Sequence, residues 1–125
     1  MAEGRCEACG ATYATAEGSC ASRFDELLAL DHSHREPWGS RHGLAFAVYA
    51  AQHPERYGVA SARAGLARLA REFAPGSVGP AFGPHAPFRV TIADLGDFAA
   101  ETYAADLERW CRATLAAFAA VPGAE

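Results

Sequence analysis

Cys6-Glu7-Ala8-Cys9-Gly10, near the N-terminus, is followed eleven residues later by a third cysteine, Cys20. Two cysteines separated by two residues can direct two thiolates at one cation, and the glycine accepts the left-handed backbone angles that such a turn often needs. Cys20 is close enough in sequence to close a small loop on the same ion. The spacing therefore predicts a zinc knuckle at residues 6–10, hereafter the knuckle.

Length and composition favour one helical unit with a thin core. The chain has 125 residues, enough for one domain but not for two separate cores. Half of the residues (50%) are hydrophobic, and many of these are alanine, which buries little area per residue. We expect residues 1–125 to form a single zinc-binding helical domain. Residues 1–5 are expected to be disordered, and residues 6–19 to form the knuckle and a loop without regular structure.

Charge and hydropathy exclude several classes of partner. The formal net charge is -4 and all 11 basic residues are arginine, so general nucleic-acid binding is not expected. No apolar run approaches the roughly 20 residues of a membrane span, and Met1–Arg5 has no signal-peptide core. A cytoplasmic location is expected, where thiols stay reduced and clustered cysteines are more often ligands than disulfides.

Helical periodicity predicts an all-α fold, a small bundle of about four helices. The expected helices cover residues 20–33, 41–53, 58–74 and 98–120. Ser19 and Ser40 are the expected caps of the first two helices, and Pro54 ends the second because the residue before a proline disfavours the helical backbone region. Thr91 and Asp94 form a capping pair for a short helical turn.

Two further features interrupt or weaken the helical pattern. Gly65 lies within the third expected helix and costs about 1 kcal/mol relative to alanine. Residues 75–90 are rich in proline and glycine and predict a long loop before the last helix. The chain shows no internal repeat.

The first two helices should pack antiparallel, because they have similar lengths and a short connection. In such a pair, residues that are the same number of positions from the centre of the 34–39 turn lie side by side, and this count places Cys20 beside His53. The knuckle leads directly into Cys20, so Cys6 and Cys9 should lie at this same end. The predicted ligand set is therefore Cys3His, which zinc binds tetrahedrally with no position left over.

The same count places His42 level with Asp31, near His32 and His34, at the opposite end of the helix pair. His42 and His53 lie about 16 Å apart at 1.5 Å per residue, so they cannot share one metal ion. His42 is the second candidate for the fourth ligand, and His32 or His34 follows it.

Each ligand assignment has a simpler alternative. Cys6 and Cys9 can be ordinary thiols or a redox pair, although a thioredoxin-like motif would need a preceding strand and a following helix. Cys20 can be a small buried residue of the helix stripe, and His53 can be a histidine stabilised by the dipole at a helix C-terminus. Cys111 is interpreted as a buried thiol beside a tryptophan.

A polar group at the far helix end has two interpretations. Its members are Asp31, His32, His34, Glu36 and His42. Such a group can form a second metal or acid–base site, but a solvated polar helix end is the favoured interpretation. Tyr49 and Gln52 are interpreted as packing and hydrogen-bonding residues that support a histidine ring.

Longer motifs carry a family resemblance over nearly the whole chain. They are Cys6-x-x-Cys9-Gly10, Cys20 before Phe24-Asp25-Glu26-Leu27-Leu28, the stretch His42–Pro54 ending Tyr49-x-x-Gln52-His53-Pro54, Thr91-Ile-Ala-Asp-Leu95, and Trp110. With these motifs the sequence resembles a family of small uncharacterised bacterial proteins classed as a domain of unknown function. The resemblance implies a helical fold and a shared pattern that includes His42, Tyr49, Gln52 and His53. It implies no activity, and this chain has Glu7-Ala8 where the family pattern has a proline inside the knuckle.

Two functions are favoured by these features over a third, a redox or metal-trafficking role of the cysteines. The first is a zinc-binding helical protein whose metal is mainly structural and which binds a protein or a small molecule, with Phe82 and Phe88 of the loop as a contact surface. The alternative is a zinc-dependent hydrolase or lyase acting on a small molecule, with an open coordination position. Tyr49 or His42 would then act as acid or base, and Gln52 would orient the substrate.

Overall fold

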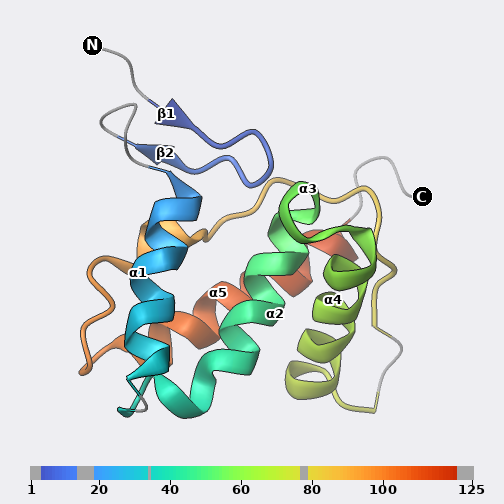
Figure 1. Ribbon diagram of the computed structural model, residues 1–125. Coiled ribbons are helices and arrows are strands. Elements are labelled where there is room, and N and C mark those ends of the chain that lie inside the picture. Colours follow the sequence, from blue (N-terminus) through green and yellow to red (C-terminus); the bar gives the residue numbers. More distant parts are fainter. Residues whose placement is uncertain (1–3, 14–18, 34, 77–78, 121–125) are drawn as a thin grey trace.

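Helices make up most of the computed structural model, which describes residues 4–13, 19–33, 35–76 and 79–120. The helices are α1 (Cys20–His32), α2 (His42–Gln52), α3 (Pro54–Tyr57), α4 (Val59–Phe73) and α5 (Tyr103–Ala119) (Figure 1). Two 3-10 turns, η1 (Gly39–Arg41) and η2 (Ile92–Leu95), and two short strands, β1 (Gly4–Arg5) and β2 (Thr12–Tyr13), complete the fold. The predicted all-α fold is confirmed, and the four-residue α3 is additional to the four expected helices. None of the helices described here is both long and apolar enough to cross a membrane.

The first two helices run antiparallel from a common turn. α1 leads away from the N-terminal hairpin and α2 returns toward it (Figure 1). Ser19 caps α1 as predicted, accepting a hydrogen bond from the Ser22 backbone at 3.0 Å. The predicted cap of α2 is wrong, because the Ser40 hydroxyl donates to the Glu36 carboxylate at 2.5 Å and lies inside η1. Arg41 precedes α2 without a side-chain cap.

The N-terminal segment is more ordered than the sequence predicts. β1 pairs antiparallel with β2, with Gly4 opposite Tyr13, so the prediction of disorder is wrong for Gly4 and Arg5, and the prediction of a loop without regular structure is wrong for Thr12 and Tyr13. Residues 1–3 lie outside the described part of the chain. The cause is the knuckle, which turns the chain back on itself through backbone hydrogen bonds from Cys6 to Ala11 (2.8 Å) and from Gly10 to Cys6 (2.7 Å). Strands of two residues are too short to produce a visible alternation in the sequence.

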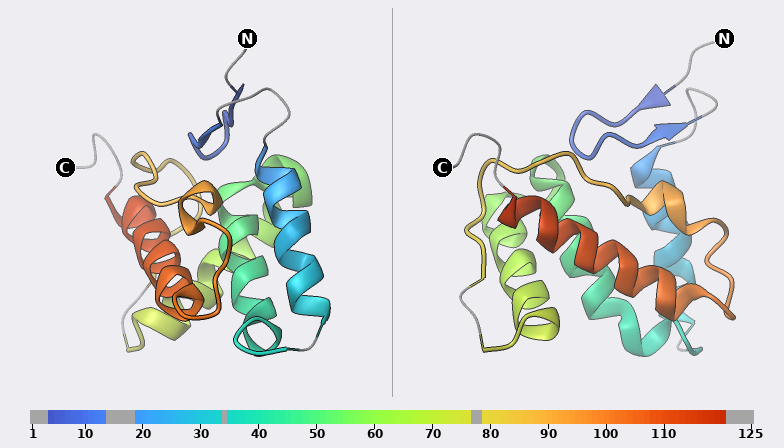
Figure 2. Two further views of the ribbon diagram at one scale, coloured as in Figure 1. Left: turned by 90° about the vertical axis from the view of Figure 1, so that its left-hand side faces the viewer. Right: turned by 180° about the vertical axis from the view of Figure 1, so that it is seen from behind.

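α2, α4 and α5 pack against one another, and Phe24 and Leu27 of α1 belong to the same core. α5 contacts α2 and α4 and crosses behind them in Figure 1; in the right-hand view of Figure 2, seen from behind, it lies in front. A Cβ atom at Gly65 would overlap the backbone oxygen of Ala47, so this glycine lets α4 approach α2 closely. The largest fully buried side chains include Phe24, Tyr49, Tyr103, Trp110 and Phe118. The glycine that weakens α4 as an isolated helix is thus required by its packing.

The final helix begins later than predicted. η2 carries the expected capping box of Thr91 and Asp94. Phe98 is then buried with a positive φ of 60°, a backbone angle that an α-helix does not contain. Its carbonyl oxygen accepts a hydrogen bond from the Trp38 indole at 2.9 Å. The backbone at Phe98 is therefore incompatible with the expected helix start at residue 98, and α5 begins at Tyr103.

Candidate metal centre

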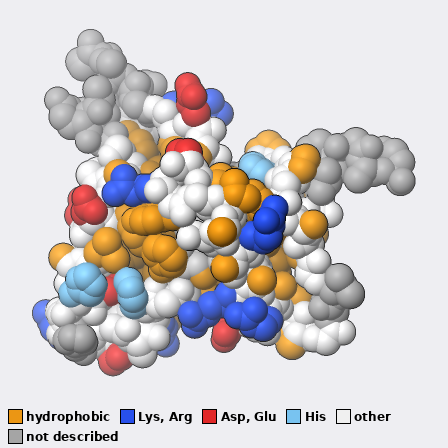
Figure 3. Space-filling model, turned by 45° about the vertical axis from the view of Figure 1, so that its right-hand side comes forward, with side chains coloured by type: hydrophobic (Ala, Val, Ile, Leu, Met, Phe, Trp, Pro, Cys, Tyr) orange, Lys and Arg blue, Asp and Glu red, His pale blue; other side chains and the backbone are white. Residues whose placement is uncertain are grey.

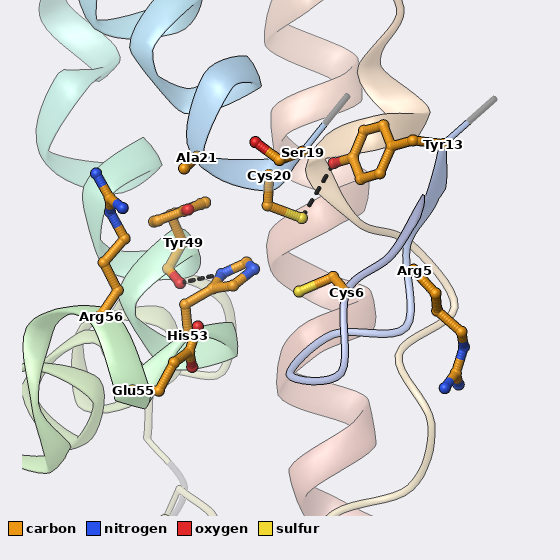
Figure 4. A pocket seen from close by; sticks show the side chains of 10 residues that line it. All are labelled: Arg5, Cys6, Tyr13, Ser19, Cys20, Ala21, Tyr49, His53, Glu55 and Arg56. Carbon is orange, nitrogen blue, oxygen red and sulfur yellow. Dashed lines mark hydrogen bonds between the residues drawn. The ribbon is translucent and has the colours of Figure 1, made fainter. Parts of the chain in front are cut away.

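Three thiols and one imidazole meet where the hairpin lies against α1 and α2. They belong to Cys6, Cys9, Cys20 and His53, hereafter the Cys3His cluster (Figure 4 shows all but Cys9), and their ligand atoms all lie within 4.8 Å of one another. The sulfurs of Cys9 and Cys20 are 3.5 Å apart. Tetrahedral zinc with bonds of about 2.3 Å places neighbouring sulfurs about 3.8 Å apart. The cluster therefore has the dimensions of a tetrahedral metal site after adjustments of about 1 Å.

The knuckle positions the first two thiols. Gly10 has a φ of 87°, which only glycine adopts without strain, and this angle completes the turn after Cys9. Cys9 is buried, with 4% of its surface exposed, whereas Cys6 is half-buried at the edge of the cluster. The turn thus carries one inner and one outer thiol.

The third thiol is held by the start of α1. Cys20 is the first residue of the helix, directly after the capping Ser19. The hydroxyl of Tyr13 donates a hydrogen bond to the Cys20 sulfur at 3.0 Å. Tyr13 is absent from the residues predicted for the site, because its role depends on β2 pairing with β1 and no spacing rule reveals that pairing.

His53 is fixed between two helices. It ends α2 and precedes Pro54, the first residue of α3. Its Nδ1 donates to the carbonyl oxygen of Tyr49 at 2.9 Å, and the two rings stack at 4.1 Å. Nε2 therefore carries the lone pair, yet it is buried without a hydrogen-bond partner in the described structure. A buried acceptor left unpaired costs about 1–3 kcal/mol, a cost that a bound cation removes.

The electrostatics of the cluster favour a cation. The hydrogen bond from the Cys9 thiol lowers the pKa of Cys20 to about 4, against the opposing effect of burial, and the hydrogen bond from the Tyr13 hydroxyl lowers it further. The pKa of Cys9 is raised by the same hydrogen bond and by burial. The protein alone thus stabilises one thiolate and resists a second. A divalent ion would offset the repulsion between thiolates and make all three sulfurs ligands.

An open-sided cavity of about 510 Å³ lies beside the cluster (Figure 4). Cys6, Cys20 and His53 line it, together with Tyr49 and Arg56. Burial raises the pKa of Tyr49, and the charge of Cys20 adds to this effect, so its phenol stays protonated at neutral pH. A small molecule in this cavity would meet three of the four candidate ligands.

The family model of DUF5946, a family of unknown function, matches residues 4–78, more than half of the chain. The chain belongs to this family. The resemblance to a family of unknown function is thereby confirmed, and the matched residues include the whole Cys3His cluster. No curated protein and no solved structure matches the chain.

In this DUF5946 member, the other histidine candidates lie elsewhere. His42 Nδ1 is 2.9 Å from the buried carboxylate of Asp31, and the ring of His32 is 5.8 Å from that of His42. Burial raises the pKa of Asp31, and His42 opposes that shift. Glu36 is engaged at the start of η1, and His34 lies outside the described residues. Among the residues that the structure describes, the Cys3His cluster is the one group of three or more such side chains close enough to hold an ion.

Gln52 and Cys111 serve the core rather than the cluster. The Gln52 amide donates to the carbonyl oxygen of Val90 and to the Thr114 hydroxyl, both at 2.9 Å. Cys111 is fully buried in α5, and burial raises its pKa to about 12. Of the three residues suggested for catalysis, only Tyr49 therefore faces the cavity beside the cluster; Figure 4 shows it there with His53.

Proposed function

We propose that the protein binds one zinc ion through the Cys3His cluster and that the role of this ion is mainly structural. The observation that carries the proposal is the buried, unpaired Nε2 of His53 in a residue whose imidazole lies with three thiols, one ligand atom from each of the four residues being within 4.8 Å of the others. Thiolates and imidazole are the ligands that zinc takes in structural sites, and four protein donors fill a tetrahedral shell.

The expected benefit of the ion is the attachment of the hairpin. Strands of two residues are marginal on their own, and the ion would join the knuckle to the start of α1 and the end of α2. A zinc-fastened scaffold of this kind serves best as a binding protein for a protein or a small molecule. The net charge of -4 disfavours nucleic acid as the partner. Reduced thiols suit a cytoplasmic location, which we retain as part of the proposal.

The test is the metal content of the untagged protein after purification and after reconstitution with zinc. We expect about one zinc per chain, lost in Cys20→Ser. Cys111→Ser is the matched control, because it removes an equally buried thiol outside the cluster. A protein that takes up no zinc, or a Cys20→Ser variant that keeps it, would overturn the proposal.

A zinc enzyme is the second candidate, and the cavity of about 510 Å³ favours it. If the half-buried Cys6 left the ion, water would take its place, and metal-bound water is acidic enough to act as a nucleophile near neutral pH. Tyr49 would supply a proton in a hydrolase or lyase reaction. Cobalt substitution separates the two candidates: azide should change the visible spectrum of an open site and leave that of a closed one unaltered.

A further inference from the structure

A second cavity, of about 580 Å³, lies between the knuckle, the end of α2 and the irregular 79–91 segment. The residues that carry its chemistry are Glu7, Gln52, Glu55, Phe82, His85 and Phe118. We propose that this cavity binds a small organic ammonium ion with an aromatic or alkyl body. Cys6 of the Cys3His cluster also lines this cavity, but the proposal goes beyond the zinc site, because the six side chains named above, and not the ion, would hold the ligand.

One residue that lines the cavity, Gln52, has a buried acceptor that lacks a donor. Gln52 is 1% exposed, and both hydrogens of its amide nitrogen are used by Val90 and Thr114. The Thr114 hydroxyl donates in turn to the Trp110 carbonyl at 2.8 Å, so it must accept from Gln52, and this fixes the orientation of the amide. The Gln52 oxygen is left buried and unpaired in a residue that lines the cavity. A ligand N–H group that reaches this buried oxygen would satisfy it.

The charge of the cavity wall is negative. Glu7 and Glu55 line the cavity and are exposed, whereas its lining contains no arginine. Carboxylates accept hydrogen bonds and cannot donate them. An ammonium group is therefore complementary to this wall, and a carboxylate or phosphate ligand would be repelled.

An aromatic wall lines another part of the cavity. The rings of Phe82 and His85 lie 5.4 Å and 4.9 Å from that of Phe118. The 79–91 segment passes above the end of α5 (Figure 2), and a backbone hydrogen bond from Ala86 to Ala117 at 2.9 Å holds it there. Aromatic faces attract cations and pack against an apolar body, so both parts of the ligand find contacts.

The test is a titration of the zinc-loaded, ¹⁵N-labelled protein with 2-phenylethylamine, followed by NMR. The neutral 2-phenylethanol and the anionic 3-phenylpropionate are matched probes of similar size. We expect the amine to bind at least about ten-fold more tightly than either, since it alone combines charge complementarity with N–H donors. The Gln52 side-chain amide resonances should shift. Equal binding of the three probes, or shifts confined to other parts of the protein, would overturn the proposal.

Variants locate the site. Glu7 lines this cavity but not the one beside the Cys3His cluster. Glu7→Gln should weaken binding of the amine about two- to five-fold, the usual range for an exposed charge pair, and Phe82→Ala should weaken it further. Glu72→Gln, an exposed change on α4, is the matched control and should leave the affinity unaltered. An amine that binds Glu7→Gln and Phe82→Ala as tightly as the wild type does not occupy this cavity.

Discussion

The two ends of the α1–α2 pair each place a histidine beside a group from α1, yet they form different kinds of site. At the hairpin end, His53 is 1% exposed and lies with three thiols. At the other end, the His42 side chain is 41% exposed and bonds to the buried carboxylate of Asp31. Figure 3 shows one face of the molecule, on which histidine side chains lie next to a broad group of hydrophobic ones.

The difference shows what separates a metal centre from an ordinary polar contact between helices. The Nδ1 atoms of both histidines have oxygen partners within the protein. Only His53 also has a buried, unpaired Nε2 beside several sulfurs. The number of soft donors and the burial of the remaining lone pair therefore mark the candidate metal site, and the presence of a histidine at a helix end does not.

Removal of the ion tests this comparison most severely. With free zinc about 1,000-fold above its dissociation constant, binding stabilises the folded state by about 4 kcal/mol. Chelation should therefore lower the melting temperature by about 15 °C for a chain of this size. Circular dichroism melts with and without a chelator measure the effect. An unchanged melting curve would show that no ion stabilises the hairpin end of the α1–α2 pair, and would refute a structural ion.

Paired histidine variants sharpen the comparison directly. His53→Ala should abolish stoichiometric zinc binding, measured by competition with a chromophoric chelator, because it removes a ligand. His42→Ala should leave zinc binding unchanged and lower the free energy of unfolding by about 1–3 kcal/mol, since the buried Asp31 carboxylate loses its partner. Loss of zinc in His42→Ala would contradict the separation of the two sites.

A substitution in the contact between α4 and the middle of α2 should change the free energy of unfolding without affecting either end of the α1–α2 pair. Gly65→Ala places a Cβ against Ala47 and should lower the free energy of unfolding by about 1–2 kcal/mol, despite the better helix propensity of alanine. The matched control is Ala64→Gly at an exposed neighbouring position, which should cost about 1 kcal/mol through propensity alone. Urea denaturation measures both. A more stable Gly65→Ala protein would mean that α4 does not approach α2 this closely.

The smallest expected effect is a pH dependence at the Asp31 end. Burial raises the pKa of Asp31 in the folded protein, and His42 opposes the shift. When the pKa of an acid is higher in the folded state than in the unfolded state, the acid stabilises the folded state fully at a pH below its unfolded-state pKa, which is about 4 for an aspartate. This contribution to the free energy of unfolding is lost as the pH rises through the folded-state pKa. Asp31→Asn lacks this contribution.

Urea denaturation of the wild type and of Asp31→Asn across the acid range measures this effect. The advantage of the wild type over Asp31→Asn should shrink as the pH rises, while any loss of metal common to both proteins cancels in the difference. A wild-type advantage that grows with pH would show that the interaction with His42 outweighs burial.

Several features can be predicted from the sequence because they depend on residues that are close along the chain. The stripe and cap of α1 follow from side-chain spacing and from the Ser19 hydroxyl. The meeting of Cys20 with His53 follows from two antiparallel helices of similar length around a short turn, and their ligand atoms do lie together. The start of α2 does not follow from such rules, because Glu36 competes for the Ser40 hydroxyl.

The amino-acid order thus dictated the helices, the knuckle and the level at which four candidate ligands meet, since each depends on local periodicity or on counting along rigid helices. Long-range packing alone decided the bond from Tyr13 to Cys20, the need for Gly65, the positive φ of Phe98 and the inward direction of Gln52. These features arise from contacts between segments far apart in the chain or from strands too short to leave a pattern. The free energy of each such contact depends on which surfaces of the folded chain meet, and the linear sequence does not specify those surfaces.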